Sequence, residues 1–289
     1  MQKPKTKSLK AKVLAFAVLA LLFFAGEAFS QTDLENLAQL VTRGNSEQKR
    51  SALFEIRNLE TAEASRLALP ALRDSEEIVR ASATSSVVFL PPGEAANALI
   101  PLLRDKKPFV RKETAYALGK TRSAGVIRPL IEIIQKDKIQ EVKDAATVAL
   151  GEIGDVSAVN ALISILQRRP KKEEEFMRRS AARSLGKIAQ NQFLQRQTSQ
   201  KIPDNSLQNT IEIRANLSKE IPELRKAAVL LIKILQTQTE TDDAKRETAY
   251  ALGEIGDVSA IPVLQANLNS EDYYLAENSR QALAKIGYR

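Results

Sequence analysis

Apolar side chains recur at three- and four-residue spacing along most of this chain of 289 residues. One example is the set Val159, Leu162, Ile163, Ile165 and Leu166, which would share one side of an α-helix. Patterns of this kind predict amphipathic helices at roughly 125–136, 157–168, 225–237 and 259–269. Each of them has an apolar side to bury and a polar side to turn toward solvent.

Two strings recur almost unchanged. Residues 112–119 read KETAYALG and residues 246–253 read RETAYALG, while ALGEIGDVSA occupies both 149–158 and 251–260. Alignment on an apolar residue followed by a basic one gives repeat starts about 31 residues apart. These starts are Gln48, Val79, Val110, Val142, Met177, Ala244 and Leu275. The interval of 67 residues before Ala244 has room for two units, the second starting near Thr210, so the sequence predicts about eight repeats.

Each repeat is predicted to form two antiparallel helices. The fifth position of the first helix carries a small residue, which lets neighbouring helices approach closely. These residues are Ala52, Ala83, Thr114, Ala146, Ala181, Thr248 and Ser279. Later in the same helix a glycine follows a leucine, and we expect it to end or bend the helix. These glycines are Gly119, Gly151, Gly186 and Gly253. Asp155 and Asp257 lie in the following turns, where each would cap a second helix.

A unit of this size cannot bury a core alone, so neighbouring units must stack and share one. We therefore predict an all-α fold, an α-solenoid that winds as a right-handed superhelix of antiparallel helix pairs. Residues 31–289 would form it, with 31–45 as an N-terminal capping helix and 270–289 as a C-terminal cap. Pro70 and Pro101 fall inside predicted second helices and imply kinks or late starts there.

Residues 190–220 interrupt the pattern. The stretch 191–201 is polar and rich in glutamine, and Ile202, Pro203 and Asp204 then break it. We expect an irregular repeat or insertion here, in which the second helix of the fifth unit is distorted, shortened or replaced by a loop.

The ALGEIGD strings and the period of about 31 residues resemble HEAT repeats, specifically the short subtype named from phycobilisome lyases. The resemblance covers residues 45–289 and implies a binding protein whose second helices line a concave face. Deoxyhypusine hydroxylases are similar in repeat length, but that family holds a di-iron centre with His-Glu pairs, and this chain contains no histidine. Phycobilin lyases, which join a bilin to a cysteine of an acceptor protein in the cytoplasm, leave a lyase-like accessory role as an alternative.

The first thirty residues differ from the rest. Five lysines precede an apolar run from Val13 to Ala25, and the small residues Ala28 and Ser30 follow it. This order predicts a signal peptide at residues 1–30 with cleavage near Ser30/Gln31. A stable membrane anchor needs about 20 apolar residues, and this run has 13. We therefore prefer cleavage and keep a retained anchor as the alternative. We expect an exported protein, periplasmic or secreted, with no membrane insertion after cleavage.

Composition narrows the chemistry further. Without residues 1–30, the chain has 38 basic and 34 acidic residues, so most of the formal charge of +8 belongs to the targeting segment. We therefore expect no nucleic-acid partner. The chain contains no histidine and no cysteine, which excludes His- and Cys-dependent catalysis, imidazole or thiolate metal sites, and disulfides. We expect a monomeric protein that is not an enzyme and has no cofactor.

Polar positions on the second helices should stack into columns on the concave face. One predicted column is Arg66, Asn97, Arg128 and Asn160, and a second is Arg73, Arg104, Gln135 and Gln167. Together they would form a mildly basic groove for a partner protein. A solvated face without a partner is the alternative. The exposed tyrosines Tyr273 and Tyr274 are a second candidate interface.

A basic residue also occupies the second position of six of these repeats. These residues are Lys49, Arg80, Arg111, Lys143, Arg178 and Lys245. Acids stand five residues before three of the repeat starts, at Asp74, Asp105 and Asp137. We expect ion pairs between repeats from this arrangement, in preference to an anion-binding strip.

The sequence therefore predicts a non-catalytic protein–protein interaction scaffold of the bacterial envelope or the secreted space, with its partner on the concave face. Two alternatives stay open. One is an accessory or chaperone-like factor for a separate enzyme, and the other is a structural spacer.

Overall fold

The computed structural model describes residues 31–199 and 207–288. The predicted signal peptide, residues 1–30, lies outside the described residues. Within them the elements are α-helices and short 3₁₀ helices, so the predicted all-α fold is confirmed.

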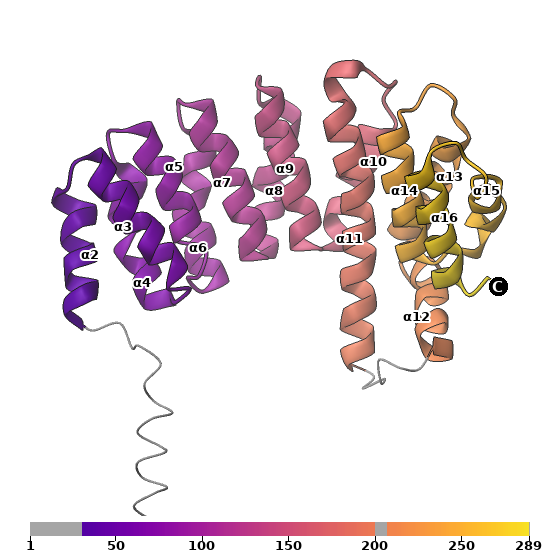
Figure 1. The fold of residues 1–289 in the computed structure, drawn as a ribbon, viewed down its shortest axis with the longest axis horizontal. Coiled ribbons are helices and arrows are strands. Elements are labelled where there is room, and N and C mark those ends of the chain that lie inside the picture. The colour runs from indigo at the N-terminus through magenta and orange to yellow at the C-terminus, as the bar shows by residue number, and fades with distance from the viewer. Residues whose placement is uncertain (1–30, 200–206, 289) are drawn as a thin grey trace, which may run out of the picture.

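The first helices of the repeats form one layer, in which each helix packs against the next. They stand side by side across Figure 1. Their bounds are α3 (Ser46–Asn58), α5 (Glu77–Ser86), α7 (Pro108–Thr121), α9 (Gln140–Ile153), α11 (Glu175–Ser199), α14 (Asp242–Ile255) and α16 (Tyr273–Ile286). At the N-terminal end α2 (Gln31–Arg43) packs against α3.

The second helices form the other layer, and α6 and α8 are seen behind the first helices in Figure 1. Their bounds are α4 (Ala62–Leu67), α6 (Pro92–Leu99), α8 (Ile127–Lys136), α10 (Val159–Leu166), α13 (Pro222–Gln236) and α15 (Ile261–Ala266). The apolar residues of both layers meet in one continuous core that runs along the whole row. The chain is therefore an α-solenoid, as the repeat pattern predicts.

Prolines divide the second helices of the first two units. Helix α4 is followed by the 3₁₀ helix η1 (Leu69–Arg73) and α6 by η2 (Ile100–Arg104), with Pro70 and Pro101 in their first turns. Proline has no N–H for the helical hydrogen bond and its ring clashes with the preceding turn, so an α-helix cannot run through it unchanged. The predicted kinks at both positions are confirmed.

The turn between paired helices has its predicted structure in two units. Gly154 and Gly256 follow α9 and α14 with φ of 72° and 74°, a conformation that other residues adopt only with strain. The carboxylate of Asp155 then accepts the N–H of Ser157 at 2.8 Å, and Asp257 does the same for Ser259 at 2.9 Å. The expected aspartate caps are confirmed, and they stand on the 3₁₀ turns η4 (Val156–Ala158) and η6 (Val258–Ala260) that begin the second helices.

The glycines after the repeated leucine have another role than the expected one. Gly151 lies inside α9 and Gly253 inside α14, so neither ends its helix. A Cβ atom on Gly151 would stand 2.8 Å from the Cα of Ser184 in the next first helix, and one on Gly253 would stand 2.7 Å from the Cα of Ala282. These glycines are required because the first helices cross at very short distance. The small residues at the fifth repeat position are fully buried at the same layer, as predicted.

The long interval before α14 holds one repeat and an insertion, so the expectation of two units there is wrong. Helix α11 continues to Ser199, an additional helix α12 (Leu207–Glu220) follows, and α13 is an intact second helix. Because α11 packs directly against α14, no further unit fits between them. The described residues contain seven first helices, against about eight expected.

The polar stretch after residue 190 stays helical because α12 covers it. Phe193 of α11 is buried, and Ile213 and Leu217 of α12 are buried as well. The guanidinium of Arg214 lies 4.0 Å from the centre of the Phe193 ring and also pairs with the buried carboxylate of Glu254 in α14. The insertion is therefore a helical hairpin that packs on the C-terminal units, and the predicted distortion of the second helix is absent from α13.

Candidate functional site

A row of ion pairs joins the first helix of one repeat to the loop that precedes the first helix of the next. Arg80 Nε lies 2.8 Å from Asp105 Oδ2, and Arg111 Nε lies 2.7 Å from Asp137 Oδ2. A second guanidinium nitrogen binds the other carboxylate oxygen in each case, so both contacts are bidentate. Lys49 pairs with the third aspartate, Asp74, at 2.6 Å. The expected pairing between repeats is confirmed for these three aspartates.

The same aspartates hold the loops in which they stand. Asp105 Oδ1 accepts the N–H of Lys107 at 2.8 Å, and Arg111 donates to the carbonyl of Asp105 at 3.0 Å. Burial alone would raise the pKa of Asp105, but the hydrogen bonds from Arg80 and from the Lys107 N–H outweigh it and hold this pKa below its usual range. We call this row of ion pairs at Asp74, Asp105 and Asp137 the clamp. Its carboxylates bind groups of the same chain, so its role is structural.

The C-terminal units keep the clamp with other residues. Arg178 pairs with Glu240, and only 3% of either side chain is exposed. Arg178 also donates to the carbonyl of Arg168 at 2.8 Å. This bond gives a partner to a backbone carbonyl that follows the C-terminal end of α10. In the following unit Arg246, one position after the predicted Lys245, pairs with Asp272. Sequence spacing missed Glu240 and Asp272 because their loops differ in length from those of the first units.

The predicted partner-binding residues lie where the sequence placed them, on the second-helix layer. All eight are exposed: Arg66, Arg73, Asn97, Arg104, Arg128, Gln135, Asn160 and Gln167. Arg66 forms a bidentate ion pair with Glu94 of the next unit, at 3.1 and 2.9 Å, so its charge is compensated. The predicted columns are therefore less basic than their sequence suggests.

Two adjoining hollows run along part of this layer. One of about 470 Å³ includes Pro70, Arg73 and Asn97 in its lining, and one of about 720 Å³ includes Arg104 and Ile133. Pro101 lines both. They open where the prolines replace the end of an α-helix by a 3₁₀ segment. The other five predicted residues, Arg66, Arg128, Gln135, Asn160 and Gln167, line neither hollow.

Arg73 is the charged residue in the lining of the smaller hollow, and the larger hollow is lined by three basic and three acidic residues: Arg104, Arg111, Lys136, Asp105, Glu132 and Asp137. Arg73 and Arg104 form no ion pair with any residue of 31–199 or 207–288. Glu132 in the same lining accepts a hydrogen bond from Lys136 at 2.9 Å, and this bond, with a smaller effect from the charge of Arg104, lowers the pKa of Glu132. Sequence reasoning identified the two arginines but missed the proline-lined apolar floor beside them, although Pro70 and Pro101 were its signal.

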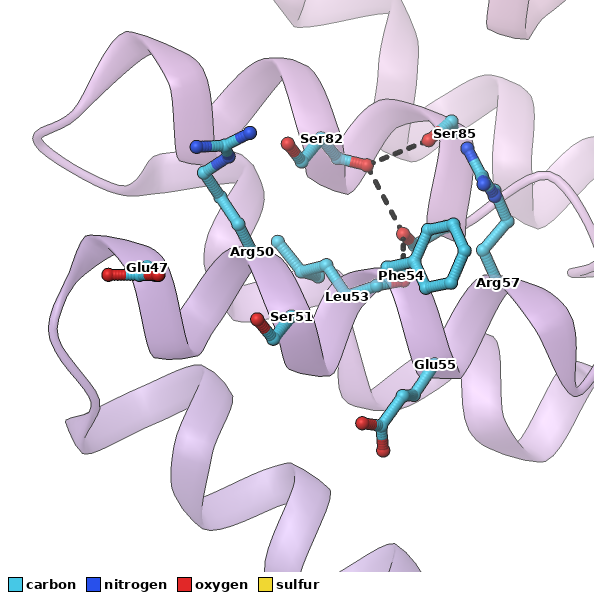
Figure 2. A pocket seen from close by; sticks show the side chains of 10 residues that line it. Glu47, Arg50, Ser51, Leu53, Phe54, Glu55, Arg57, Ser82 and Ser85 are labelled. Carbon is cyan, nitrogen blue, oxygen red and sulfur yellow. Dashed lines mark hydrogen bonds between the residues drawn. The ribbon is translucent and has the colours of Figure 1, made fainter.

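The first-helix layer has a hollow of its own, between α3 and α5. It measures about 540 Å³, and Figure 2 shows Arg50, Phe54 and Arg57 of α3 along one side and Ser82 and Ser85 of α5 on the other. Phe54 is 55% exposed, more than Phe109 of α7 and Phe176 of α11, which are each 40% exposed. Sequence reasoning did not single out these residues.

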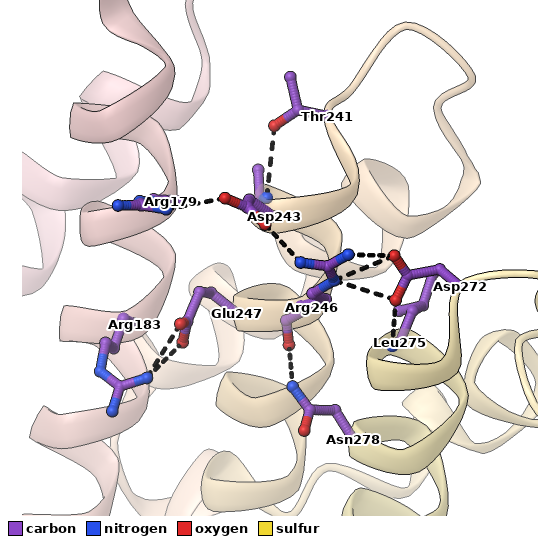
Figure 3. A network of polar contacts seen from close by, with 10 residues as sticks. Arg179, Arg183, Thr241, Asp243, Arg246, Glu247, Asp272, Leu275 and Asn278 are labelled. Atoms are coloured by element: carbon purple, nitrogen blue, oxygen red, sulfur yellow. Dashed lines mark hydrogen bonds and ion pairs between the residues drawn. The ribbon is translucent and has the colours of Figure 1, made fainter.

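Around α14 the first-helix layer carries a polar network, drawn in Figure 3. Arg179 lies 2.7 Å from Asp243, Arg183 binds both carboxylate oxygens of Glu247 at 2.9 and 3.0 Å, and Arg246 joins Asp243 at 2.6 Å. Each charged group has an oppositely charged partner inside the network. The small hollow that it borders, of about 310 Å³, is therefore explained by packing between α11, α14 and α16.

The two candidate tyrosines stand at the start of α16. Tyr273 is 70% and Tyr274 63% exposed, and their rings meet edge to face with centroids 5.5 Å apart. Arg246 lies 5.2 Å from the centre of the Tyr274 ring. The pair is accessible, and Tyr274 lines the hollow of about 310 Å³ beside the polar network.

Acidic residues do not gather into a metal site in the described ranges, where no group of three or more candidate ligands meets. None of the described helices combines the length and apolar character that crossing a bilayer requires.

Comparison with protein families identifies the repeat. A family described as HEAT repeats matches residues 65–151 and 127–196, and one described as PBS lyase HEAT-like repeat matches residues 244–270. A sequence search of curated proteins gives no match.

Solved structures with a similar fold are at most distantly related in sequence. An engineered protein is 20% identical, with 88% of this chain and 68% of that chain covered and a TM-score of 0.49. The complex of CpcE and CpcF of phycocyanin lyase from Nostoc sp. PCC7120 is 18% identical, with 90% and 89% covered and a TM-score of 0.48. Human deoxyhypusine hydroxylase in complex with glycerol is 19% identical, with 89% and 96% covered and a TM-score of 0.38. At these identities the likeness concerns the fold alone.

Proposed function

The chain belongs to the HEAT-repeat proteins and carries repeats of the PBS-lyase type, and from this premise we propose that it is a non-catalytic scaffold that binds a partner protein on its second-helix layer. Stacked repeats expose long continuous surfaces, and such surfaces suit the binding of an extended partner. The site would lie on the first three units, where the two proline-lined hollows adjoin.

The observation that carries this proposal is an apolar floor beside two exposed arginines that form no ion pair with the described residues. Pro70, Pro101 and Ile133 line the hollows, and Arg73 and Arg104 stand at them one repeat apart without ion pairs among the described residues. An extended protein segment with apolar side chains and carboxylates would bury the first and neutralise the second. Arginine beside a desolvated apolar pocket is a common source of binding energy at protein interfaces.

The absence of catalysis is part of the proposal. It is supported by the lack of histidine and cysteine in the sequence and by the use of the buried acids in ion pairs between repeats. Export to the periplasm or the secreted space is proposed from residues 1–30, whose lysines and apolar run have the order of a signal peptide. The partner would then be a protein of the envelope or of the secreted space.

The test is a pull-down from the envelope fraction with protein purified from cells that express the full chain. We expect one defined protein to bind the native chain and to be lost from the variant Arg73→Glu/Arg104→Glu. The matched control is Lys226→Glu/Lys233→Glu, which reverses two exposed charges on α13 and should leave binding intact. Equal retention by all three proteins would exclude the hollows as the site, and retention by none would favour the spacer role.

A further inference from the structure

Helix α5 is the shortest of the described first helices, with 10 residues against 13 in α3 and 14 in α7. It ends at Ser86, and Pro91 and Pro92 then begin the next helix after a tight turn. At this end Ser86 Oγ donates to the carbonyl of Leu53 in α3 at 2.8 Å. The hollow lies between the facing sides of α3 and α5, and the ring of Phe54 is exposed beside it.

Arg50, Phe54 and Arg57 are spaced by four and three residues, so they share one side of α3. In Figure 2 both guanidinium groups extend toward α5, on either side of the Phe54 ring, while Glu55 points away from α5. The Arg57 guanidinium lies 4.9 Å from the ring centre. Neither arginine forms an ion pair within the described ranges. The hollow thus presents two arginines without ion pairs around an aromatic surface, and Glu47 and Glu55 also belong to its lining.

The opposite side of the hollow offers hydrogen-bond acceptors. Ser82 Oγ donates to the carbonyl of Ile78 at 2.8 Å, and Ser85 Oγ donates to the carbonyl of Ser82 at 2.9 Å. With their protons used inside α5, both hydroxyls have only lone pairs to present. An inorganic anion would find donors on α3 but acceptors on α5. A peptide supplies both carboxylates and backbone N–H groups, so it matches the two sides.

We propose that this α3–α5 groove is a second docking site, which takes an acidic protein segment with an apolar anchor. The anchor would cover the exposed ring of Phe54, carboxylates would bind Arg50 and Arg57, and peptide N–H groups would bind Ser82 and Ser85. The two arginine positions are about 10 Å apart along the helix axis, the span of a few extended residues. The groove belongs to the first-helix layer, so it is independent of the hollows proposed above on the second-helix layer. One solenoid end would hold two partners.

The probe is a short fluorescein-labelled synthetic peptide with two central leucines flanked by glutamates, titrated against the full-length protein and followed by fluorescence anisotropy. We expect saturable binding that weakens roughly tenfold or more in Arg50→Ala/Arg57→Ala, because each charge-assisted contact is lost. The same peptide with serines in place of leucines should bind less tightly to the native protein. In Phe54→Ser this difference between the two peptides should disappear. The substituted side chains are surface groups, and equal melting temperatures would verify the fold.

Other variants and competitors decide the assignment. Arg73→Glu/Arg104→Glu and Lys226→Glu/Lys233→Glu should bind the peptide like the native protein, even where the first of them loses the envelope partner. The proposal is overturned if the peptide does not bind, if Arg50→Ala/Arg57→Ala leaves its affinity unchanged, or if Arg73→Glu/Arg104→Glu weakens it equally. Displacement by inorganic phosphate at constant ionic strength, as effective as by unlabelled peptide, would also overturn it and indicate an anion site.

Discussion

At the residue scale, the aspartates between repeats connect stability to pH. Asp105 receives hydrogen bonds from Arg80 and from a backbone N–H, and its pKa lies below the usual range although burial acts to raise it. The pKa values of Asp74 and Asp137 are lowered in the same way. A depressed folded-state pKa means that the unfolded chain binds more protons in acid. The stabilisation is therefore complete above the unfolded pKa of about 3.9 and is lost as the pH falls through the folded-state values.

Replacing one of these carboxylates should show this dependence directly. We expect Asp105→Asn to lower the free energy of unfolding at neutral pH by about 2–3 kcal/mol, because Arg80 loses a charged acceptor in a largely buried contact. The difference from the native protein should begin to shrink below about pH 4, because the unfolded native chain then binds a proton at Asp105, and it should be smallest below the lowered folded-state pKa of Asp105. Urea titrations at several pH values measure it. The control Glu94→Gln, in the exposed pair with Arg66, should cost less than about 1 kcal/mol. An equal cost for both variants would contradict the structural role of the clamp.

At the element scale, glycine sets how closely the first helices approach. A Cβ on Gly151 would stand 2.4 Å from Ser184 Oγ and 2.8 Å from Ser184 Cα, and the second contact involves backbone that cannot rotate away. We expect Gly151→Ala to destabilise the protein by about 1–3 kcal/mol through overpacking, although alanine favours helices. Gly93→Ala in α6 is the matched control, since nothing lies within 4 Å of its added Cβ. It should be neutral or slightly stabilising in thermal denaturation. A stabilising Gly151→Ala would show that α9 and α11 can separate freely.

Which elements the sequence could predict depends on whether their contacts are local. Paired helices, aspartate caps and proline kinks follow from residues within one repeat, and all of these predictions are confirmed. The helical course of residues 190–199 depends instead on α12, which packs against α11 and places Arg214 over the ring of Phe193 only after the chain has folded back. A polar stretch that has no apolar segment nearby in the sequence to pack against it is predicted as a loop. For the same reason the repeat period could not show that α11 and α14 are direct neighbours.

The candidate site was predictable to the same extent. Repeat offsets placed Arg73, Asn97 and Arg104 correctly on one layer, because a column needs only the period. They could not show that Arg66 is neutralised by Glu94, since that contact joins side chains of two units. The hollow between α3 and α5 was missed because it depends on how side chains of two neighbouring units face each other, which the repeat period does not show.

At the scale of the whole molecule, each first helix contacts mainly its neighbours in the row, so a local defect should remain local. In Gly151→Ala we expect faster backbone hydrogen exchange in α9 and α11, which lose close packing, and unchanged exchange in α3 and α5. Hydrogen-exchange mass spectrometry of the native and variant proteins measures this difference. The acidic peptide should accordingly bind Gly151→Ala with native affinity, because the α3–α5 groove lies outside the disturbed units. Uniformly faster exchange along the row would mean that the solenoid unfolds as one cooperative unit, and its two proposed docking sites would then share the stability of every repeat.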